Sequence, residues 1–381
     1  MNWQTKNIED CIDKIAYTNK IQRKDFLESG IFPIISQEQD LINGYWNKKE
    51  DVFHSSKPVV VFGDHTQILK YIDFDFVLGA DGVKLLQPKD FLYPKYFYYF
   101  LQSINLRSLG YARYYRLLKE KDISYPESIS EQKKITKKLE EIFEKLEKAK
   151  ENTEKNLQNS KELFESYLND IFSNPGKDWE ESSLNKITSK IGSGATPNGG
   201  EKSYKEQGIS LIRSLNIHDN GFRYKDLAHI DDDQATKLNN VIVECDDVLL
   251  NITGASIARC CIVPRDVLPA RVNQHVSIIR TDKNKIESEF LRYILISKFY
   301  KDILLGIGKE KGVTRQALTK SIIKNFFIKF PKSFQEQKRI VKILDQLSEK
   351  TQKLESIYKQ KLESIEELKK SILQKAFSGG L

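Results

Sequence analysis

Pro126-Glu-Ser-Ile-Ser-Glu-Gln-Lys-Lys-Ile135 and Pro331-Lys-Ser-Phe-Gln-Glu-Gln-Lys-Arg-Ile340 open two stretches of this chain that are copies of each other. Residues 126–173 align with residues 331–378 at a constant offset of 205 residues and without a gap. A duplicated segment of this length predicts two globular parts that alternate with two similar helices. This arrangement restricts the plausible functions more than any single residue does.

Both copies have the pattern of a long coiled-coil helix. The seam of a coiled coil repeats at alternating steps of four and three residues. In the first copy the seam positions are 135, 139, 142, 146, 149, 153, 156, 160, 163 and 167, and in the second they are the equivalent residues 340 to 372. Ser128 and Ser333 each precede a Glu by three residues, the spacing of a capping box. Asn174-Pro175-Gly176 and Gly379-Gly380 mark the two helix ends.

The two helices are expected to pair with each other. A helix of roughly 40 residues is about 60 Å long, and neither copy can bury its apolar stripe alone. We expect antiparallel pairing within one chain, although each helix could instead pack only on its own globular part or pair with a second chain. Phe143, Phe164 and Phe172 lie off the seam. They are candidates for contact with a partner protein, or for packing against the globular parts.

The regions outside the helices predict α+β domains. Short apolar runs such as Pro58–Phe62, Val83–Leu86 and Asp247–Leu250 are typical of strands, and a helix-like segment closes each region. The expected fold class is α+β, with two globular α/β domains separated by two long helices that form an antiparallel coiled coil, in a pseudo-two-fold internal repeat. The expected boundaries are a first domain at 1–130, a first helix at 131–173, a second domain at 174–335 and a second helix at 336–381.

The distribution of charge favours an acidic partner for the second domain only. The 381-residue chain has a formal net charge of +8. Residues 1–130 contain 17 basic and 17 acidic residues, whereas residues 174–335 contain 25 basic and 19 acidic residues. Net charge therefore supports nucleic-acid binding by the second domain and says nothing about the first.

The sequence contains no recognisable signature of catalysis or metal binding. Gly194–Gly199 is the closest approach to a phosphate-binding loop, but Gly200 and Glu201 stand where such a loop needs Lys and then Ser or Thr. The four cysteines and five histidines lack metal-ligand spacing, so we expect buried, reduced thiols. The first residues form no apolar leader, and no apolar run approaches the ~20 residues of a membrane span. We therefore expect a cytoplasmic protein that is not an enzyme by itself.

The ordered set of motifs resembles the specificity (S) subunits of type I restriction-modification systems. The duplicated Pro-x-Ser-x-x-Glu-Gln-Lys-(Lys/Arg)-Ile resembles the repeated regions of that family. Val59–Thr66 resembles its FGDHT element, and Ile191–Pro197 resembles its GxTP opening. Asn251–Ile257 and Val272–Val276 resemble its TGxSIG…NQ stretch, although Ala258 stands where the family usually has glycine. The resemblance covers nearly the whole chain.

The resemblance implies a subunit without catalysis of its own. Each domain, a target-recognition domain in that family, would read one half of a bipartite double-stranded DNA sequence. The paired helices would set the unread spacer and dock two methyltransferase (M) subunits. This chain would bind no cofactor, whereas partner subunits would use S-adenosylmethionine, ATP and Mg, with restriction (R) subunits cleaving unmodified DNA.

Two other interpretations predict different behaviour. A coiled-coil scaffold or adaptor with protein partners only would show no salt-dependent affinity for DNA. A single-chain restriction-methylation enzyme would need fused methyltransferase motifs, which this sequence does not contain.

The DNA-binding candidates of the first domain centre on a basic, aromatic segment. Sequence reading needs hydrogen-bonding side chains at base edges and cations at phosphates. Arg and Tyr alternate between Arg107 and Lys121, so a local basic patch is expected despite the domain's zero net charge. A solvated loop is the alternative, and for the Gly-Asp-His-Thr motif it is a turn whose side chains bond the backbone. The candidates are Lys20, Arg23, His65, Thr66, Arg107, Arg113, Tyr114, Tyr115 and Arg116.

The candidates of the second domain are spread over several loops. The segment Gly308–Gln316 stands at the corresponding place before the second helix. Asn273 and Gln274 suit bidentate readout of adenine, or they could be buried amides that brace loops. The candidates are Ser193, Thr196, Arg213, Asn216, Thr253, Ser256, Arg259, Asn273, Gln274, Lys309, Lys311, Arg315 and Gln316.

Overall fold

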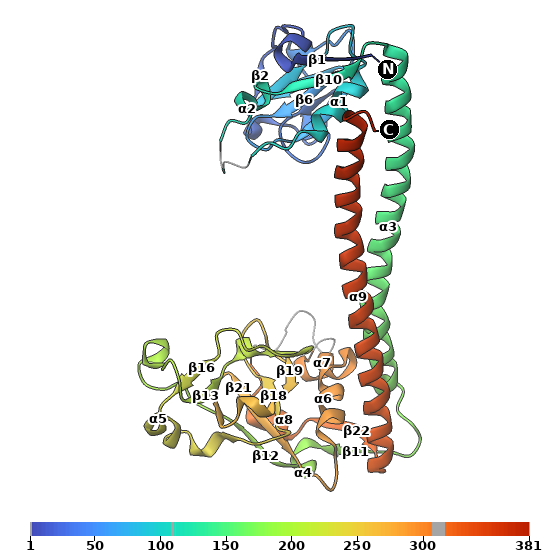
Figure 1. Ribbon diagram of the computed structural model, residues 1–381. Helices are drawn as coiled ribbons and strands as arrows, with labels where there is room; N and C mark the ends of the chain where they lie inside the picture. Colours follow the sequence, from blue (N-terminus) through green and yellow to red (C-terminus); the bar gives the residue numbers. More distant parts are fainter. Residues whose placement is uncertain (1, 108–109, 111, 307–316, 381) are drawn as a thin grey trace. The chain divides into compact units, whose positions relative to one another are not determined.

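The computed structural model describes residues 2–107, 110, 112–306 and 317–380. They form two compact units, which Figure 1 shows with their elements labelled. The first unit contains residues 1–155 and 359–381, and the second contains residues 156–358. Each unit holds a globular domain and part of both long helices, α3 (Ile129–Ser173) and α9 (Phe334–Phe377). The domain boundaries expected from the sequence stay a prediction.

The first domain is built from small sheets and short helices. One sheet has the strand order β2-β8-β3-β4 with β5 beside β8, another has the order β7-β6-β9, and β1 pairs with β10. Strand β8 runs parallel to β2 and β3, and the other pairs are antiparallel. The bounds are β1 Trp3–Asn7, β2 Lys20–Ile21, β3 Phe32–Ile35, β4 Gly44–Trp46, β5 Val52–Phe53, β6 Val59–Gly63, β7 Leu69–Ile72, β8 Phe76–Gly79, β9 Val83–Leu86, α1 Pro94–Ser103, α2 Tyr115–Lys119 and β10 Asp122–Pro126.

The second domain has more strands in a different order. Its main sheets have the orders β12-β21-β18-β19 and β16-β13-β20-β17, and β14 pairs with β15 and β11 with β22. The bounds are β11 Trp179–Ser183, α4 Leu184–Ile187, β12 Thr188–Ser193, β13 Ile209–Ile212, β14 Ile217–His218, β15 Gly221–Phe222, β16 Ala228–Ile230, α5 Asp232–Thr236, β17 Ile242–Val243, β18 Val248–Asn251, β19 Cys260–Ile262, β20 Ala270–Val272, β21 Val276–Thr281, α6 Ser288–Ile296, α7 Lys298–Leu305, α8 Lys320–Lys324 and β22 Phe327–Pro331.

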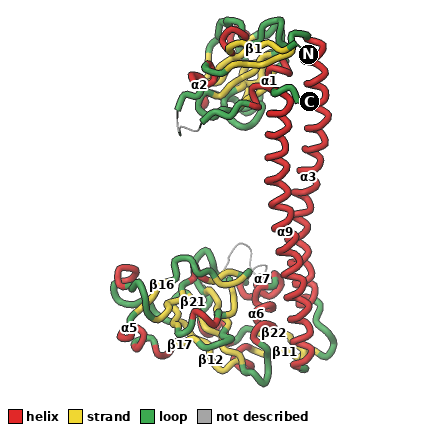
Figure 2. Tube along the Cα trace, in the orientation of Figure 1, coloured by secondary structure: helices red, strands yellow, loops and turns green. Residues whose placement is uncertain are grey.

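Figure 2 shows strands gathered in the globular domains and α3 and α9 as continuous helices. The predicted α+β class is therefore confirmed.

The internal repeat begins earlier in the chain than the aligned sequences indicate. Helices α2 and α8, and strands β10 and β22, lie at the same offset of 205 residues as the long helices. The partner strands also match, because β1 places Trp3 opposite Pro126 and β11 places Trp179 opposite Pro331. Structure is thus shared where sequence identity has already faded.

A buried glutamine joins each long helix to its own domain. Gln132 accepts a hydrogen bond from the Tyr93 backbone N–H (2.7 Å) and donates to the carbonyl oxygens of Phe91 and Pro126 (both 2.9 Å). The equivalent Gln337 makes three bonds of the same kind, to Glu287, Lys285 and Pro331. Both side chains are fully buried. Since Tyr93 and Glu287 are the N-cap residues of α1 and α6, this amide fixes one domain helix against the base of the long helix.

The antiparallel pairing of α3 and α9 is visible within each unit separately. In the first unit, Leu139 near the start of α3 shares a core with Leu373 and Phe377 near the end of α9. In the second unit, the end of α3 contributes Leu168 and Phe172 to a core that also contains Ile340 and Leu344 from the start of α9. The predicted antiparallel coiled coil is confirmed.

The predicted seam is wrong in the last turns of each helix. The seam residues Leu163, Tyr167 and Leu368 are 52%, 40% and 48% exposed, whereas Leu168 and Leu373 are buried. A straight helix with 3.6 residues per turn drifts away from a strict seven-residue repeat. Large apolar side chains one position further along therefore turn into the domain cores.

The off-seam phenylalanines pack on the domains, so their predicted alternative role in partner contact is not supported. Phe143 contacts Tyr99 with ring centroids 5.5 Å apart, and Phe164 lies 6.3 Å from Tyr293. Phe172 is fully buried and meets the rings of Trp179, Phe290 and Tyr300.

Candidate nucleic-acid interface

In the first domain, the turn after β6 holds the basic segment that precedes α2. The buried Asp64 carboxylate accepts a hydrogen bond from the Tyr115 backbone N–H (2.8 Å), and its carbonyl oxygen accepts one from Tyr114 (2.7 Å). The Nδ1 atom of His65 lies 3.1 Å from the Ala112 carbonyl oxygen. Two motifs that are about 50 residues apart in the sequence therefore form one structure.

The three arginines of this segment lie at the surface of the domain, where a partner can reach them. The side chains of Arg107, Arg113 and Arg116 are exposed. Tyr115 is half-buried, with the ammonium groups of Lys84 and Lys119 at 5.4 and 5.5 Å from its ring centroid. Lys119 is also paired with Glu9, so the exposed arginines are the cations of this segment that suit contact with phosphates.

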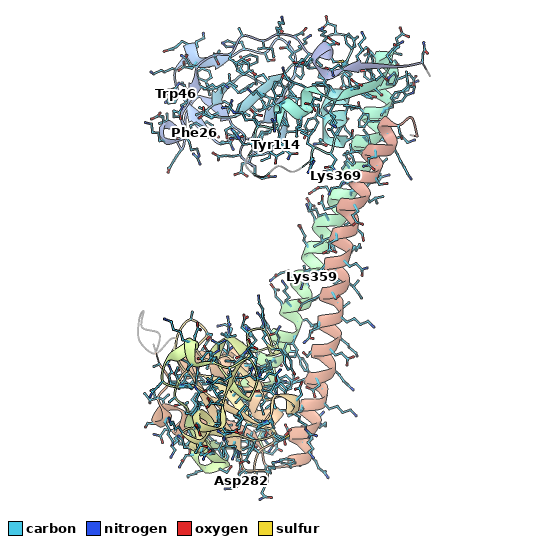
Figure 3. All side chains as sticks on the ribbon, turned by 60° about the vertical axis from the view of Figure 1, so that its left-hand side comes forward. Phe26, Trp46, Tyr114, Asp282, Lys359 and Lys369 are labelled. Atoms are coloured by element: carbon cyan, nitrogen blue, oxygen red, sulfur yellow. The ribbon has the colours of Figure 1, made fainter. Side chains whose placement is uncertain are left out.

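Tyr114 has a structural place instead. It is 3% exposed, and its hydroxyl donates to the Gly110 carbonyl oxygen at 2.8 Å. Figure 3 labels it among the side chains of the first domain. A base contact by Tyr114 would require this hydrogen bond to break.

Lys84 belongs to the basic patch and is missing from the sequence-based candidates. Lys20 donates to the Val83 carbonyl oxygen at 3.1 Å. Burial lowers the pKa of Lys20, and the neighbouring charge of Lys84 lowers it further. The alternation of Val83, Lys84 and Leu85 along β9 is the signal that could have identified an outward-facing cation.

The remaining candidates of the first domain make local contacts. Thr66 donates to the carbonyl oxygen of Gln37 in another segment at 2.8 Å, and its hydroxyl oxygen accepts from the Ile68 N–H at 3.4 Å, which is the local bond that the turn interpretation expects. Arg23 pairs with Glu38 at 2.8 Å and lies over the Phe26 ring, but its side chain is 63% exposed. Contact of Arg23, His65 or Thr66 with DNA stays a prediction.

In the second domain, three loops bring a polar cluster together. The cluster comprises Thr196, Thr253, Gln274 and His275. Thr196 donates to the Gln274 amide oxygen, the Gln274 amide nitrogen lies 3.1 Å from His275 Nε2, and His275 Nδ1 lies 2.6 Å from the Thr253 hydroxyl. Gln274 is exposed and the other three are half-buried. The sequence predicted three of these residues but missed His275, which only its neighbours in space identify.

A glycine makes the approach of these loops possible. A Cβ atom at Gly194 would lie 1.7 Å from the Val272 carbonyl oxygen. The backbone N–H of Gly194 also donates to the Asn273 carbonyl oxygen at 3.2 Å. The glycine of the Gly-Ala-Thr-Pro motif therefore brings Thr196 within reach of Gln274.

Several candidates of the second domain brace the fold. Asn216 is fully buried and bonds the backbone of Arg213 and Arg223. Asn273 is 5% exposed and accepts from the His275 backbone N–H at 3.1 Å. These two side chains match the interpretation of buried amides, and we do not include them in the interface.

Two candidate arginines of the second domain, Arg213 and Arg259, already have partners within the domain. Arg213 pairs with Glu201 at 3.0 Å and donates to the Asp226 carbonyl oxygen at 2.6 Å. Arg259 lies 3.5 Å from Nδ1 of His218, and burial together with Arg223 and Arg259 lowers the pKa of that histidine. A neutral His218 can accept this bond from the guanidinium.

Ser256 and Ser193 are the last candidates within the described residues, and four further candidates lie outside them. Ser256 accepts from Asn251 Nδ2 at 3.0 Å, and Ser193 is exposed at the end of β12. Lys309, Lys311, Arg315 and Gln316 lie outside the described residues. The backbone N–H of Leu318, which follows them, donates to the Ile252 carbonyl oxygen at 2.8 Å. The loop after β18 therefore holds the residues that lead into α8, as the turn after β6 holds those that lead into α2.

Three of the four thiols, those of Cys11, Cys260 and Cys261, are buried. Burial raises the pKa of Cys11 to about 11 and that of Cys261 to about 12. Within the described ranges, no group of three or more His, Cys, Asp or Glu side chains is placed to hold a metal ion. No helix in the described part of the chain is long and apolar enough to cross a membrane.

Known proteins resemble this chain across most of its length. Residues 1–155 and 176–367 match the family described as "Type I restriction modification DNA specificity domain". The specificity subunit of the type I restriction enzyme EcoR124I/EcoR124II of Escherichia coli is 22% identical over 337 residues, which is 85% of this chain and 81% of that protein. The EcoBI specificity subunit of Escherichia coli is 30% identical over 208 residues, or 54% of this chain and 42% of that protein.

Solved structures share the fold. A chain from a structural study of complex assembly and conformational transition of the type I R-M system aligns with a TM-score of 0.74 and 17% identity, covering 100% of this chain and 98% of that one. The HsdS subunit from Thermoanaerobacter tengcongensis aligns with a TM-score of 0.58 and 17% identity, covering 100% of this chain and 97% of that one.

Proposed function

The chain belongs to the family of type I restriction-modification DNA specificity proteins, as a specificity subunit with two target-recognition domains, and we propose that each domain reads one half of a bipartite DNA sequence. The observation that carries this proposal is the contrast between a duplicated frame and two unlike domains. The long helices, their buried glutamines and the strands that precede them repeat at one offset of 205 residues, whereas the domain sheets differ in strand order. Unlike domains on one frame suit a target with two unlike halves.

The two domains would read DNA with different chemistry. In the first, Arg107, Arg113 and Arg116 would bind phosphates or guanine edges. In the second, the hydroxyl and amide groups of Thr196, Thr253 and Gln274 would contact bases. The backbone hydrogen bonds that hold both surfaces support this, because a preorganised surface loses less entropy on binding.

The long helices would set the spacer between the half-sites and dock two methyltransferase subunits. Leu163 and Leu368 are equivalent under the repeat and are 52% and 48% exposed. Each lies in a different unit. Equivalent exposed apolar positions, one in each unit, support two equivalent partner copies.

The chemistry of the complex would reside in the partners. Methyltransferase subunits would bind S-adenosylmethionine and methylate adenine, and restriction subunits would use ATP and Mg to cleave unmodified DNA. This chain would bind none of these cofactors and would contribute sequence selection only.

The direct test is to co-express the chain with a candidate methyltransferase subunit and to map methylated adenines across the host genome. We expect one bipartite motif of fixed spacer, absent when the methyltransferase is expressed alone. Methylation no different from that control would overturn the proposal. If the two proteins bound each other without salt-dependent affinity for DNA, the scaffold interpretation would replace it.

A further inference from the structure

The exposed side chain of Gln274 has a hydrogen-bond partner at each end of its amide. Glutamine normally has a flexible side chain that loses rotamer freedom when it is ordered. Here the Thr196 hydroxyl bonds its amide oxygen, and His275 Nε2 lies 3.1 Å from its amide nitrogen. An exposed amide with a protein partner at each end is already ordered before any ligand arrives.

The protons of this chain of bonds can be assigned. The Gln274 amide nitrogen can only donate, so His275 Nε2 accepts and its Nδ1–H donates to the Thr253 hydroxyl oxygen, 2.6 Å away. The His275 backbone is also tied, because its carbonyl oxygen accepts from the Ile252 N–H at 3.0 Å. Histidine and both threonines thus position the amide.

The arrangement leaves a defined pair of groups on the amide. Its nitrogen has two hydrogens and its oxygen two lone pairs, and the contacts to His275 and Thr196 use one of each. One N–H donor and one acceptor lone pair therefore remain on the amide. Turning the amide over leaves the same two groups, because each end still has one partner.

Adenine matches this pair best among the four bases. In the major groove adenine presents the N7 acceptor next to the N6 donor. Guanine presents two acceptors, thymine an acceptor and a methyl group, and cytosine a single donor. The oxygen of the Gln274 amide would face an acceptor on guanine, so that base is disfavoured.

We propose that Gln274 reads the N6 and N7 atoms of one adenine in the half-site bound by the second domain, with Thr196, Thr253 and His275 as its positioning residues. This inference rests on the proposed function. It selects Gln274 over the buried Asn273 for the adenine contact and adds the residues that position its amide, which the motifs alone do not supply.

The test compares wild type, Gln274→Leu and the control Gln207→Leu, each as the full chain with its methyltransferase partner. Gln207 is an exposed glutamine of the same domain. The probes are DNA duplexes that carry the mapped motif, with each second-half-site adenine replaced in turn by 7-deazaadenine, which lacks N7, or by purine, which lacks the N6 amino group. Replacement at one adenine should weaken wild-type and control binding by roughly 5- to 150-fold.

Gln274→Leu should bind the unmodified motif less tightly and become insensitive to both replacements at that one adenine. Thr196→Val, which frees one end of the amide, should show a smaller loss at the same position. Discrimination at the first half-site should be unchanged in every variant.

Two results would overturn the inference while leaving the proposed function intact. One is a Gln274→Leu complex that is as sensitive as wild type at every adenine. The other is an equal loss of affinity for all sequences, which would make Gln274 a phosphate contact. If wild type itself showed no bipartite motif, the proposed function would fail together with this inference.

Discussion

The contacts that join each domain to its long helix, called the domain–helix joint, are nearly the same in both halves. The two surfaces proposed to read DNA have only a general arrangement in common. Both joints contain a Trp–Pro strand pair and a buried glutamine with three backbone partners. Both proposed reading surfaces hold a segment against the loop that follows a strand, but the first presents exposed arginines beside Tyr115 and its two lysines, and the second an amide between Thr196 and His275. The glutamine, the proline and the tryptophan of the joints are therefore the same in both halves, whereas the residues of the two proposed reading surfaces differ.

The interiors of the domains differ in the same way. In the first domain the Lys70 ammonium is buried against backbone oxygens of Asp40 and Leu41. In the second, Arg280 pairs with the buried carboxylate of Asp247 at 2.8 Å and also with Glu244. The two domains therefore surround a partly or fully buried cation with different partners.

The largest expected effect is a loss of stability when the domain–helix joints are changed. Gln132→Leu and Gln337→Leu should each lower the free energy of unfolding by about 3–5 kcal/mol, because several buried backbone groups lose their partner. Urea unfolding would measure the loss. Hydrogen exchange should rise at Tyr93 for the first variant and at Glu287 for the second.

Gln158→Leu is the matched control, since Gln158 is exposed on α3 and bonds only Glu162 among the hydrogen bonds described for its side chain. It should change stability by no more than about 0.5 kcal/mol. Very different losses for Gln132→Leu and Gln337→Leu would mean that the two joints are not energetically equivalent.

A smaller effect should distinguish the first reading surface from the second. The double change Arg113→Ala, Arg116→Ala should weaken DNA binding about tenfold and reduce the slope of log affinity against log salt by about 2. Discrimination within the second half-site should persist. Lys145→Ala with Lys148→Ala, on α3 in the same unit, removes the same charge and should leave the slope nearly unchanged. An unaltered salt slope for the arginine variant would remove the basic segment from the interface.

The smallest expected effect is on the pH dependence of stability, through the Lys70 and Arg280 side chains. Burial lowers the pKa of Lys70 to about 8 from its ordinary value of 10.5. Between these pH values the unfolded chain binds more protons at this residue than the folded one, so its contribution makes stability rise with pH. Urea unfolding from pH 8 to 10.5 should show a smaller rise for Lys70→Met than for wild type. Arg280→Met should keep the wild-type pH slope, and equal slopes in all three proteins would refute the assignment.

Local patterns in the sequence predicted the frame well. The offset of 205 residues, the capping Ser and Glu and the Asn-Pro-Gly stop located both helices to within a few residues. The predicted seam is wrong after residue 160 of α3. There the core of the second domain, and not the partner helix alone, determines which face of the helix is buried. That information is not present in the periodicity of one helix.

The candidate interface was predicted less completely. The alternating Arg and Tyr residues marked an exposed basic segment, but the same pattern included Tyr114, which is buried. Lys84 was missed because it joins the basic segment from a strand distant in the sequence. His275 stands next to Gln274 in the sequence, but its contacts with Gln274 and Thr253 are visible only in the structure. Asn216 and Asn273 were included because an amide looks the same in sequence whether it faces a base or a backbone carbonyl.

By itself the sequence determined that this protein has two similar halves, each with a long amphipathic helix, because duplication and helical periodicity are properties of residue order. Only the tertiary structure decided which polar side chains are buried as braces and which remain exposed for a target. That choice depends on contacts between segments 50 to 80 residues apart, such as Asp64 with Tyr115 and Thr196 with Gln274. Spacing along the chain cannot encode those contacts, because they form only when the sheets bring the loops together.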